Sequence, residues 1–267
     1  MDPAGIVVYD GSLPGLLSVV FDAFDQHLSV KQLVRRRRHQ ASLLGAPVEV
    51  ATDETKASRV WSGLQKLEGF DIKTVLKCWL FDTTQSDSDL AHLCIRLFRD
   101  GAWAAEDYRD EAVFRCKQVV KKMGREIHRT HAFVRFAEAE DGLYFARIDP
   151  DFDVLPLAVA HFEDRYQDQE WIIWDGRRGY GYWFRPGQTV SQRIDPTDFD
   201  AEPGALEAGF SESQTEAAHE DGFKTLWTAY FDCVNIAARA NPKLHRQHVP
   251  TRYWRHLTEK RHKHTGA

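Results

Sequence analysis

The sequence lacks the features that define several large protein classes. It contains only four cysteines in 267 residues and no Cys-x-x-Cys pair. This argues against an iron–sulfur cluster, a zinc ribbon and a disulfide framework, so we expect free buried thiols. No run approaches the roughly 18 apolar residues that cross a bilayer, and the N-terminus lacks the cationic and apolar regions of a secretory signal. We therefore expect a cytoplasmic protein with no membrane partner.

Common catalytic and nucleotide-binding fingerprints are also missing. The chain has no Walker Gly-x-x-x-x-Gly-Lys loop, no Rossmann glycine fingerprint, no Gly-x-Ser-x-Gly elbow and no His-Glu-x-x-His helix. These absences disfavour the commonest motif-defined enzymes without excluding catalysis. With 43% hydrophobic residues, the chain can bury a sizeable core as one large domain or two small ones.

Positive charge and aromatic residues are concentrated near the C-terminus. Residues 239–267 contain eight Lys or Arg and one acid, Glu259, although the whole chain has a net charge of −5. The flat rings of Tyr253 and Trp254 can stack on bases, while arginine and lysine suit phosphate oxygens. Nucleic acid is therefore the first partner that the pattern indicates. The alternative is that the two aromatic residues anchor the tail to the domain and its cations are only solvated.

An acidic stretch precedes this basic segment. Residues 186–222 hold nine acids and a single base, Arg193, with interspersed proline and glycine. This composition predicts a solvated excursion that returns the chain to a final helix. The excursion could also shield the basic surface until a partner arrives.

The periodicity of apolar residues predicts an α+β protein. A mixed, largely antiparallel sheet is expected, with hairpins at about 132–148 and 170–185, packed against a helical layer. Phe133 to Phe136 should form the first strand of the first hairpin. The other expected elements are a strand at 6–9, a helix from Pro14 to about His27, a strand at 48–50, a helix capped by Thr52 or Asp53, helices over 70–131, and helices at 155–166 and 219–240.

Three carboxylates follow the first hairpin. Asp149, Asp151 and Asp153 precede a predicted helix, where they could bind Mg²⁺ or act as general acid and base. His128 or His161 would complete such a catalytic site. The alternative is structural, because an aspartate oxygen at a helix start accepts otherwise unpaired amide protons.

Histidines and arginines are interspersed just before this hairpin. His128 and His131, three residues apart, can share a helix face, and His161 could join them in a metal site. The neighbouring arginines oppose a metal cation and favour an anionic backbone, so no metal is predicted. They are Arg125, Arg129 and Arg135. Ordinary salt bridges between helices explain the same residues.

The turn of the second hairpin is charged as well. Asp175, Arg177 and Arg178 stand there, and they could face the basic C-terminal segment across a cleft. The alternative is a solvated hairpin tip.

Four groups of residues, in this order, resemble one protein family. They are Tyr9-Asp10-Gly11-Ser12; Gly124-Arg125-Glu126-Ile127-His128-Arg129 followed by Phe133-Val134-Arg135-Phe136; Tyr144-Phe145-Ala146-Arg147-Ile148-Asp149-Pro150-Asp151; and Asn241-Pro242 through Tyr253-Trp254. Over nearly its whole length the chain is similar to bacterial DNA repair or DNA metabolism proteins, whose domain is formally of unknown function. Members are typically encoded beside a radical-SAM DNA modification or repair protein, and related domains are fused to a uracil-DNA-glycosylase-like domain.

The resemblance implies a single family domain over residues 1–267, and it implies a pathway and partners rather than a reaction. Two departures from the family pattern stand out. Thr251 replaces the lysine of the frequent Met-Pro-Lys-Arg-Tyr-Trp ending, which removes one candidate phosphate contact. The acidic stretch is also longer than usual.

The leading hypothesis is a DNA-binding accessory protein in DNA repair or modification, with DNA and a radical-SAM enzyme as partners and no cofactor of its own. The residues expected to bind nucleic acid are Arg125, His128, Arg129, Arg135, Arg246, Arg252, Tyr253 and Trp254. The first alternative is a nucleic-acid enzyme, a glycosylase or hydrolase, for which Mg²⁺ is the cofactor to test. Its candidate catalytic residues are Asp149, Asp151, Asp153, His128 and His161. The second alternative is a protein–protein scaffold that docks through the same tail.

Overall fold

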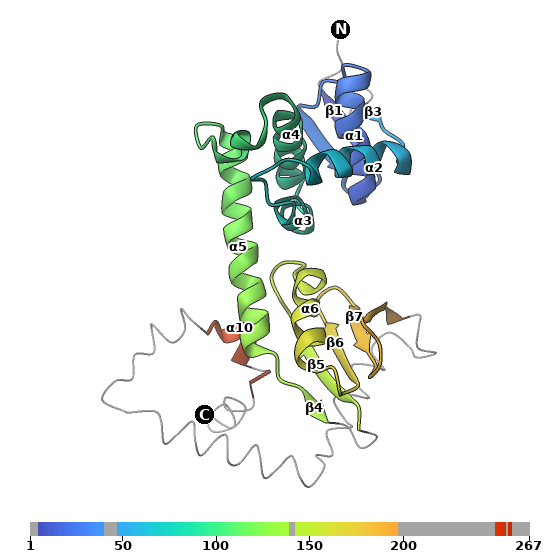
Figure 1. The fold of residues 1–267 in the computed structure, drawn as a ribbon, viewed down its shortest axis with the longest axis vertical. Helices are drawn as coiled ribbons and strands as arrows, with labels where there is room; N and C mark the ends of the chain where they lie inside the picture. The colour runs from blue at the N-terminus through green and yellow to red at the C-terminus, as the bar shows by residue number, and fades with distance from the viewer. Residues whose placement is uncertain (1–4, 40–46, 139–141, 197–248, 255, 258–267) are drawn as a thin grey trace, which may run out of the picture. The chain divides into compact units, whose positions relative to one another are not determined.

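The chain forms two compact units, Met1–Gly124 and Arg125–Ala267. The computed structural model describes residues 5–39, 47–138, 142–196, 249–254, 256 and 257. The long helix α5 (Glu111–Phe133) runs through the boundary between the units (Figure 1). The predicted helix at 219–240 and most of the acidic excursion lie outside the described residues. Within the described ranges, no helix is long and apolar enough to cross a membrane.

The first unit contains a small parallel sheet. Its central strand β1 (Ile6–Tyr9) pairs with β2 (Gln32–Arg35) on one side and with β3 (Val48–Glu49) on the other. Strands β1 and β3 confirm the sequence predictions at 6–9 and 48–50. Strand β2 was not predicted from the sequence.

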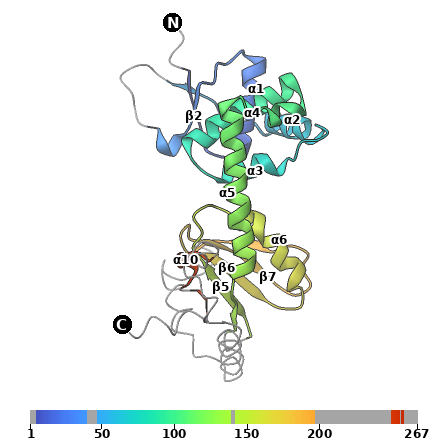
Figure 2. The same ribbon diagram turned by 90° about the vertical axis from the view of Figure 1, so that its left-hand side faces the viewer.

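Helices surround this sheet. Helix α1 packs against α2 and α4, and α4 also packs on β2 (Figure 2). The helical elements of the unit are α1 (Leu13–Asp25), η1 (Arg36–Arg38), α2 (Glu54–Gln65), α3 (Lys73–Leu80), α4 (Thr84–Asp100), η2 (Ala102–Glu106) and the first part of α5. The helical prediction for 70–131 is therefore confirmed, with breaks between the successive helices.

Side-chain caps explain where these helices begin. The Ser12 hydroxyl accepts a hydrogen bond from the Gly15 amide at 2.9 Å, which satisfies an amide that has no partner within α1. Asp53 caps α2 in the same way, as one of the two predicted caps. Thr83 and Ser86 form a reciprocal capping box at the start of α4.

The second unit contains a five-stranded sheet in the order β4-β5-β6-β7-β8. The strands are β4 (Ala137–Glu138), β5 (Tyr144–Ile148), β6 (Trp171–Asp175), β7 (Tyr180–Phe184) and β8 (Gln192–Ile194). Strands β5 and β6 are parallel and are connected through α6 (Leu155–Arg165), whereas the other neighbours are antiparallel. The predicted α+β class with a largely antiparallel mixed sheet is confirmed here, as are α6 and the hairpin at 170–185.

Helix α6 covers one face of this sheet (Figure 1). Leu155 and Phe162 of α6 pack with Ile173, and the rings of Trp171 and Phe184 stack at a centroid distance of 5.2 Å. Each of these buried side chains contributes about 1.5–3 kcal/mol relative to an exposed position. Alternate residues of the strands form a second apolar cluster of Ile172, Trp174 and Ile194.

The first hairpin differs from its prediction. Helix α5 continues to Phe133, and the first strand is only Ala137–Glu138, paired with Tyr144 and Phe145. The expected strand at 133–136 is therefore wrong. The apolar residues that indicated it are buried by other means, since Phe133 packs on Tyr253 and Phe136 packs against the core beneath α6.

The cysteines agree with the prediction of free thiols where the structure describes them. Cys78, Cys94 and Cys116 are buried and unpaired in disulfides. Burial raises the pKa of the Cys94 thiol, which keeps it protonated and unreactive. Cys233 lies outside the described residues.

Candidate functional site

A buried glutamate on α5 joins three segments of the second unit. Glu126 is 1% exposed and accepts hydrogen bonds from the Tyr253 hydroxyl at 2.8 Å and the Asp151 amide at 3.1 Å. The Arg252 guanidinium pairs with the same carboxylate at 2.5 Å. Burial alone would raise the pKa of Glu126, but these three partners outweigh it and lower the pKa below its ordinary value. Glu126 therefore stays ionised and holds the short helix α10 (Thr251–Trp254) in place.

The two aromatic residues of α10 differ in their surroundings. Tyr253 is 5% exposed, and its ring lies 5.3 Å from that of Phe133. The Trp254 indole donates a hydrogen bond to the Val249 carbonyl at 3.0 Å. Tyr253 therefore fits the alternative that the aromatic residues anchor the tail to the domain, because its ring is covered. Trp254 remains half-buried.

Acidic side chains hold three arginines in a row. Asp151 pairs with Arg252 at 2.9 Å and with Arg177 at 3.1 Å, while Arg129 lies 3.6 Å from Glu126. The side chains of Arg129, Arg252 and Arg177, which we call the arginine row, are 26%, 27% and 53% exposed. Arg177 in the turn of the second hairpin therefore meets the C-terminal segment through Asp151, which is one of the two arrangements that the sequence left open for this turn.

A histidine and an aspartate form a close pair beside this row. The His256 Nε2 atom lies 2.8 Å from Asp149 Oδ2, and both side chains are largely buried. A carboxylate in this position fixes the orientation of the imidazole ring. The pair could therefore transfer a proton to or from a bound molecule. His256 was not among the predicted catalytic residues.

The remaining aspartates of the cluster have structural partners. Asp153 accepts a short hydrogen bond from the Tyr180 hydroxyl. Neither Asp151 nor Asp153 caps α6, because the residue before the helix is Val154 and no side chain caps it. The capping prediction is therefore wrong. Pro156 in the first turn lacks an amide proton, so one donor fewer needs a partner.

A second buried carboxylate shapes the neighbouring turn. Asp175 is fully buried and pairs with Arg178 at 2.9 Å. Burial raises the pKa of Asp175, and Arg178 only partly offsets that shift. Arg178 also donates to the carbonyls of Pro150 and Asp151, at 3.2 and 3.1 Å, so the turn is fastened to the β5–α6 loop.

The other predicted nucleic-acid contacts fall in different surroundings. Arg125 and His128 are exposed on α5. Arg135 donates to the carbonyls of Ala132 and Val134 near the end of that helix, at 2.9 and 3.1 Å. Arg246 lies outside the described residues. The structure thus brings Arg129 and Arg252 together and gives Arg135 a local role.

Two of the predicted histidines lie against each other. His131 and His161 stack with a centroid distance of 4.3 Å, and His131 Nε2 lies 3.1 Å from the Ala158 carbonyl. Two stacked rings do not direct their nitrogen lone pairs to a common position, which disfavours a shared metal ion. Burial, then the charge of His161, lowers the pKa of His131. In the part of the chain that the structure describes, no group of three or more His, Cys, Asp or Glu is arranged to hold a metal.

The Tyr9–Ser12 motif of the first unit builds a closed turn. The Asp10 carboxylate accepts hydrogen bonds from the Ser12 amide at 2.8 Å and from the Thr52 hydroxyl at 2.7 Å. A Cβ on Gly15 would lie 2.2 Å from an Asp10 oxygen, so glycine is required at this position. The protein's own carboxylate thus lies beside the start of α1, where an external anion would otherwise bind.

Sequence reasoning missed two members of the site. Glu126 is inside a motif that indicated cations, and His256 is among many basic residues. Their partners are distant in the chain, since 107 residues separate His256 from Asp149. Spacing along the sequence carries no signal for such contacts.

Comparison with other proteins gives one result for the chain. No curated protein matches its sequence. A family model, described as a domain of unknown function, matches residues 85–259. That range includes Glu126, the aspartates, the arginine row and His256, and it covers more than half of the chain. The protein therefore belongs to the DUF4130 family.

Proposed function

We propose that the protein is a DNA-binding accessory protein in DNA repair or modification that acts with a radical-SAM partner. The arginine row is the observation that supports this proposal. Three guanidinium groups from distant segments are held side by side by Glu126 and Asp151, yet each side chain remains partly exposed. The link to repair and to a radical-SAM enzyme comes from the family resemblance.

The chemistry of the row suits a phosphate backbone. Three arginines face two carboxylates, which leaves an excess of positive charge. A guanidinium that is already oriented loses less side-chain freedom when it binds a phosphate, and its planar donors match phosphate oxygens in pairs. Arg125 and His128 add two exposed groups on α5. Arg125 lies four residues before Arg129 and therefore on the same side of the helix, whereas His128 is the residue next to Arg129.

Binding to labelled single- and double-stranded DNA over a salt series tests the proposal. In the double variant Arg125→Gln/Arg177→Gln, we expect weaker binding and a salt dependence that is smaller by about 1.4 to 1.8 in slope, because each lost phosphate contact removes about 0.7 to 0.9. Arg165→Gln, an exposed change on α6, is the matched control. Unchanged affinity and slope in a folded double variant would reject the row as a DNA site.

The Asp149–His256 pair favours a second candidate, a nucleic-acid enzyme of the glycosylase or hydrolase class. Its test is incubation of the same DNA with and without Mg²⁺, followed by analysis for strand cleavage or base release. Asp149→Asn should abolish product while DNA binding persists. A third outcome, no binding even at low salt, would instead favour a protein scaffold, because apolar interfaces depend far less on salt.

A further inference from the structure

Two phenylalanines meet at the surface of the first unit. Phe24 of α1 and Phe98 of α4 are 40% and 38% exposed, and their rings lie edge to face at a centroid distance of 6.1 Å. Gly63 of α2 makes room for this pair, since a Cβ there would lie 2.7 Å from the Phe98 ring. Three helices thus build one exposed aromatic platform.

Cations lie over the rings of this surface. The Arg99 guanidinium is 5.7 Å from the centroid of Phe24, and the Arg59 guanidinium is 5.0 Å from that of the neighbouring Phe21. Lys56 also approaches Phe21, but its ammonium pairs with Asp22 at 2.6 Å, so that pair adds no net charge. The platform is therefore bordered by arginines.

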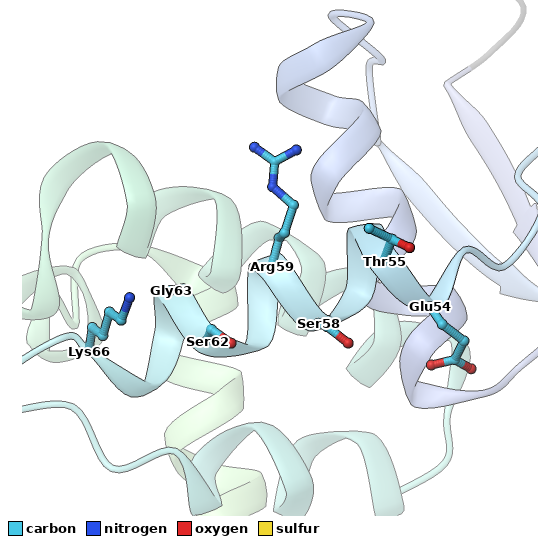
Figure 3. Close-up of a pocket in the computed structure, with 7 residues that line it drawn as sticks. All are labelled: Glu54, Thr55, Ser58, Arg59, Ser62, Gly63 and Lys66. Atoms are coloured by element: carbon cyan, nitrogen blue, oxygen red, sulfur yellow. The ribbon is translucent and has the colours of Figure 1, made fainter.

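A hollow of about 670 Å³ runs along α2 and continues this surface. Gly63 and Arg59 line it, and the same two residues contact Phe98 and Phe21, so the hollow and the platform are contiguous. Lys66 lines its far part. Figure 3 shows Arg59 and Lys66 extending to the same side of α2. Glu54, the first residue of that helix, also lines the hollow. We call this surface the α2 face; it consists of Phe24, Arg59, Gly63, Lys66, Phe98 and Arg99.

We propose that the α2 face binds single-stranded nucleic acid, with bases stacked on Phe24 and Phe98 and phosphates held by Arg59, Lys66 and Arg99. Alternating aromatic rings and cations are what a single strand requires, because every base has a flat face and every linkage carries a negative charge. A duplex keeps its bases stacked on one another, so it could use only the cations. This inference rests on the proposed function and adds a second contact surface, outside the arginine row.

The charges of the face distinguish this occupant from a protein partner. Aromatic residues and arginine are common in protein–protein interfaces as well, but the centre of such an interface is depleted of lysine and acidic residues and is closely packed. Here the aromatic rings are interleaved with cations. The acids nearby are Glu54, which lines the hollow at the start of α2, Asp22 in its pair with Lys56, and Asp25. A polyanion with flat rings complements that pattern better than an apolar protein surface.

Two sets of substitutions give different signatures on a labelled oligothymidylate of about 12 nucleotides. Arg59→Gln/Lys66→Gln should reduce the slope of log affinity against log salt by about 1.4, since each single-strand phosphate contact contributes about 0.7. Phe98→Leu should weaken binding about tenfold with an unchanged slope, because it removes a stacking surface and no charge. Phe24→Leu is the second aromatic variant in case Phe98→Leu fails to fold. If these residues had only a structural role, the charge substitutions and the phenylalanine substitutions would not differ in their effects on the salt slope.

Matched controls separate this surface from the arginine row. Lys31→Gln/Lys73→Gln removes two exposed lysines of the same unit that lie outside the α2 face and should leave both quantities unchanged. If Arg125→Gln/Arg177→Gln weakens DNA binding and the α2-face variants do not, the inference is overturned and the proposed function is left intact. If only the α2-face variants weaken DNA binding, the inference is supported and the arginine row is rejected as a DNA site. The inference would also be overturned if Phe98→Leu lost the same affinity for duplex and for single-stranded DNA, or if the protein bound no DNA at low salt.

Discussion

The Tyr253 hydroxyl donates a hydrogen bond to the buried carboxylate of Glu126, a residue 127 positions earlier in the chain. The contact fastens α10 to α5 and lets Arg252 reach the same carboxylate. Burial and the negative charge of Glu126 raise the pKa of Tyr253, so its hydroxyl remains a donor at neutral pH. One ionised side chain thus organises most of the candidate site.

Removing this hydroxyl should destabilise the protein measurably. We expect Tyr253→Phe to lower the free energy of unfolding by about 1.5–3 kcal/mol, the range for a hydrogen bond to a charged group. Urea denaturation measures this change. Tyr108→Phe is the control, because Tyr108 also donates to a glutamate, Glu106, but is 57% exposed. Similar losses of unfolding free energy in both variants would show that burial of the Tyr253–Glu126 hydrogen bond adds nothing to stability.

The lowered pKa of Glu126 predicts a pH-dependent contribution to stability. Its ordinary value is 4.5, and a carboxyl group with a lowered folded-state pKa stabilises the fold above that value. The contribution is lost as the pH falls below 4.5 and through the folded-state pKa. We expect wild type to exceed Glu126→Gln in free energy of unfolding at pH 7 and the difference to shrink steadily below pH 4.5. A difference that is the same at pH 7 and pH 3.5 would contradict this assignment.

The stacked histidines predict a shift that nuclear magnetic resonance can follow. The pKa of His131 lies below its ordinary 6.5 because of burial and then the charge of His161. His161→Phe keeps an aromatic cover but removes the charge, so the pKa of His131 should rise part of the way toward 6.5. His161→Ala also exposes the His131 ring to solvent and should raise the pKa of His131 further. Because the folded-state pKa is lowered, stability falls as pH drops below 6.5, and both variants should reduce that fall. Identical His131 titrations in all three proteins would exclude the electrostatic coupling.

Two glycines should respond oppositely to alanine. A Cβ on Gly181 would lie 2.5 Å from the backbone oxygen of Ile173 and 2.9 Å from the Trp174 ring, which a strand pair cannot accommodate without shifting. We expect Gly181→Ala to destabilise by about 1–3 kcal/mol. A Cβ on Gly124 in α5 would have nothing within 4 Å. Alanine there should therefore stabilise the protein by up to about 1 kcal/mol through its higher helix propensity. Thermal unfolding of the two variants measures both effects, and a neutral Gly181→Ala would contradict the close packing of β6 and β7.

Local sequence signals determined much of the secondary structure. Pro14 predicts the start of α1, and the apolar strands on either side of the turn at 175–178 predict the second hairpin, because these signals act through contacts within a few residues. The same reasoning failed at Phe133, whose apolar character is used against Tyr253 rather than in a strand. Local pattern therefore predicts an element well only when distant packing does not compete for the same side chains.

The sequence by itself determined the residue types of the site, a set of aspartates, histidines and arginines with two adjacent aromatics. Only the tertiary structure decided their pairing: Glu126 with Tyr253 and Arg252, Asp149 with His256, and Asp153 with Tyr180 rather than with the start of α6. The physical reason is that a buried charge is stable only beside a partner that the fold delivers, and such partners come from any distance along the chain.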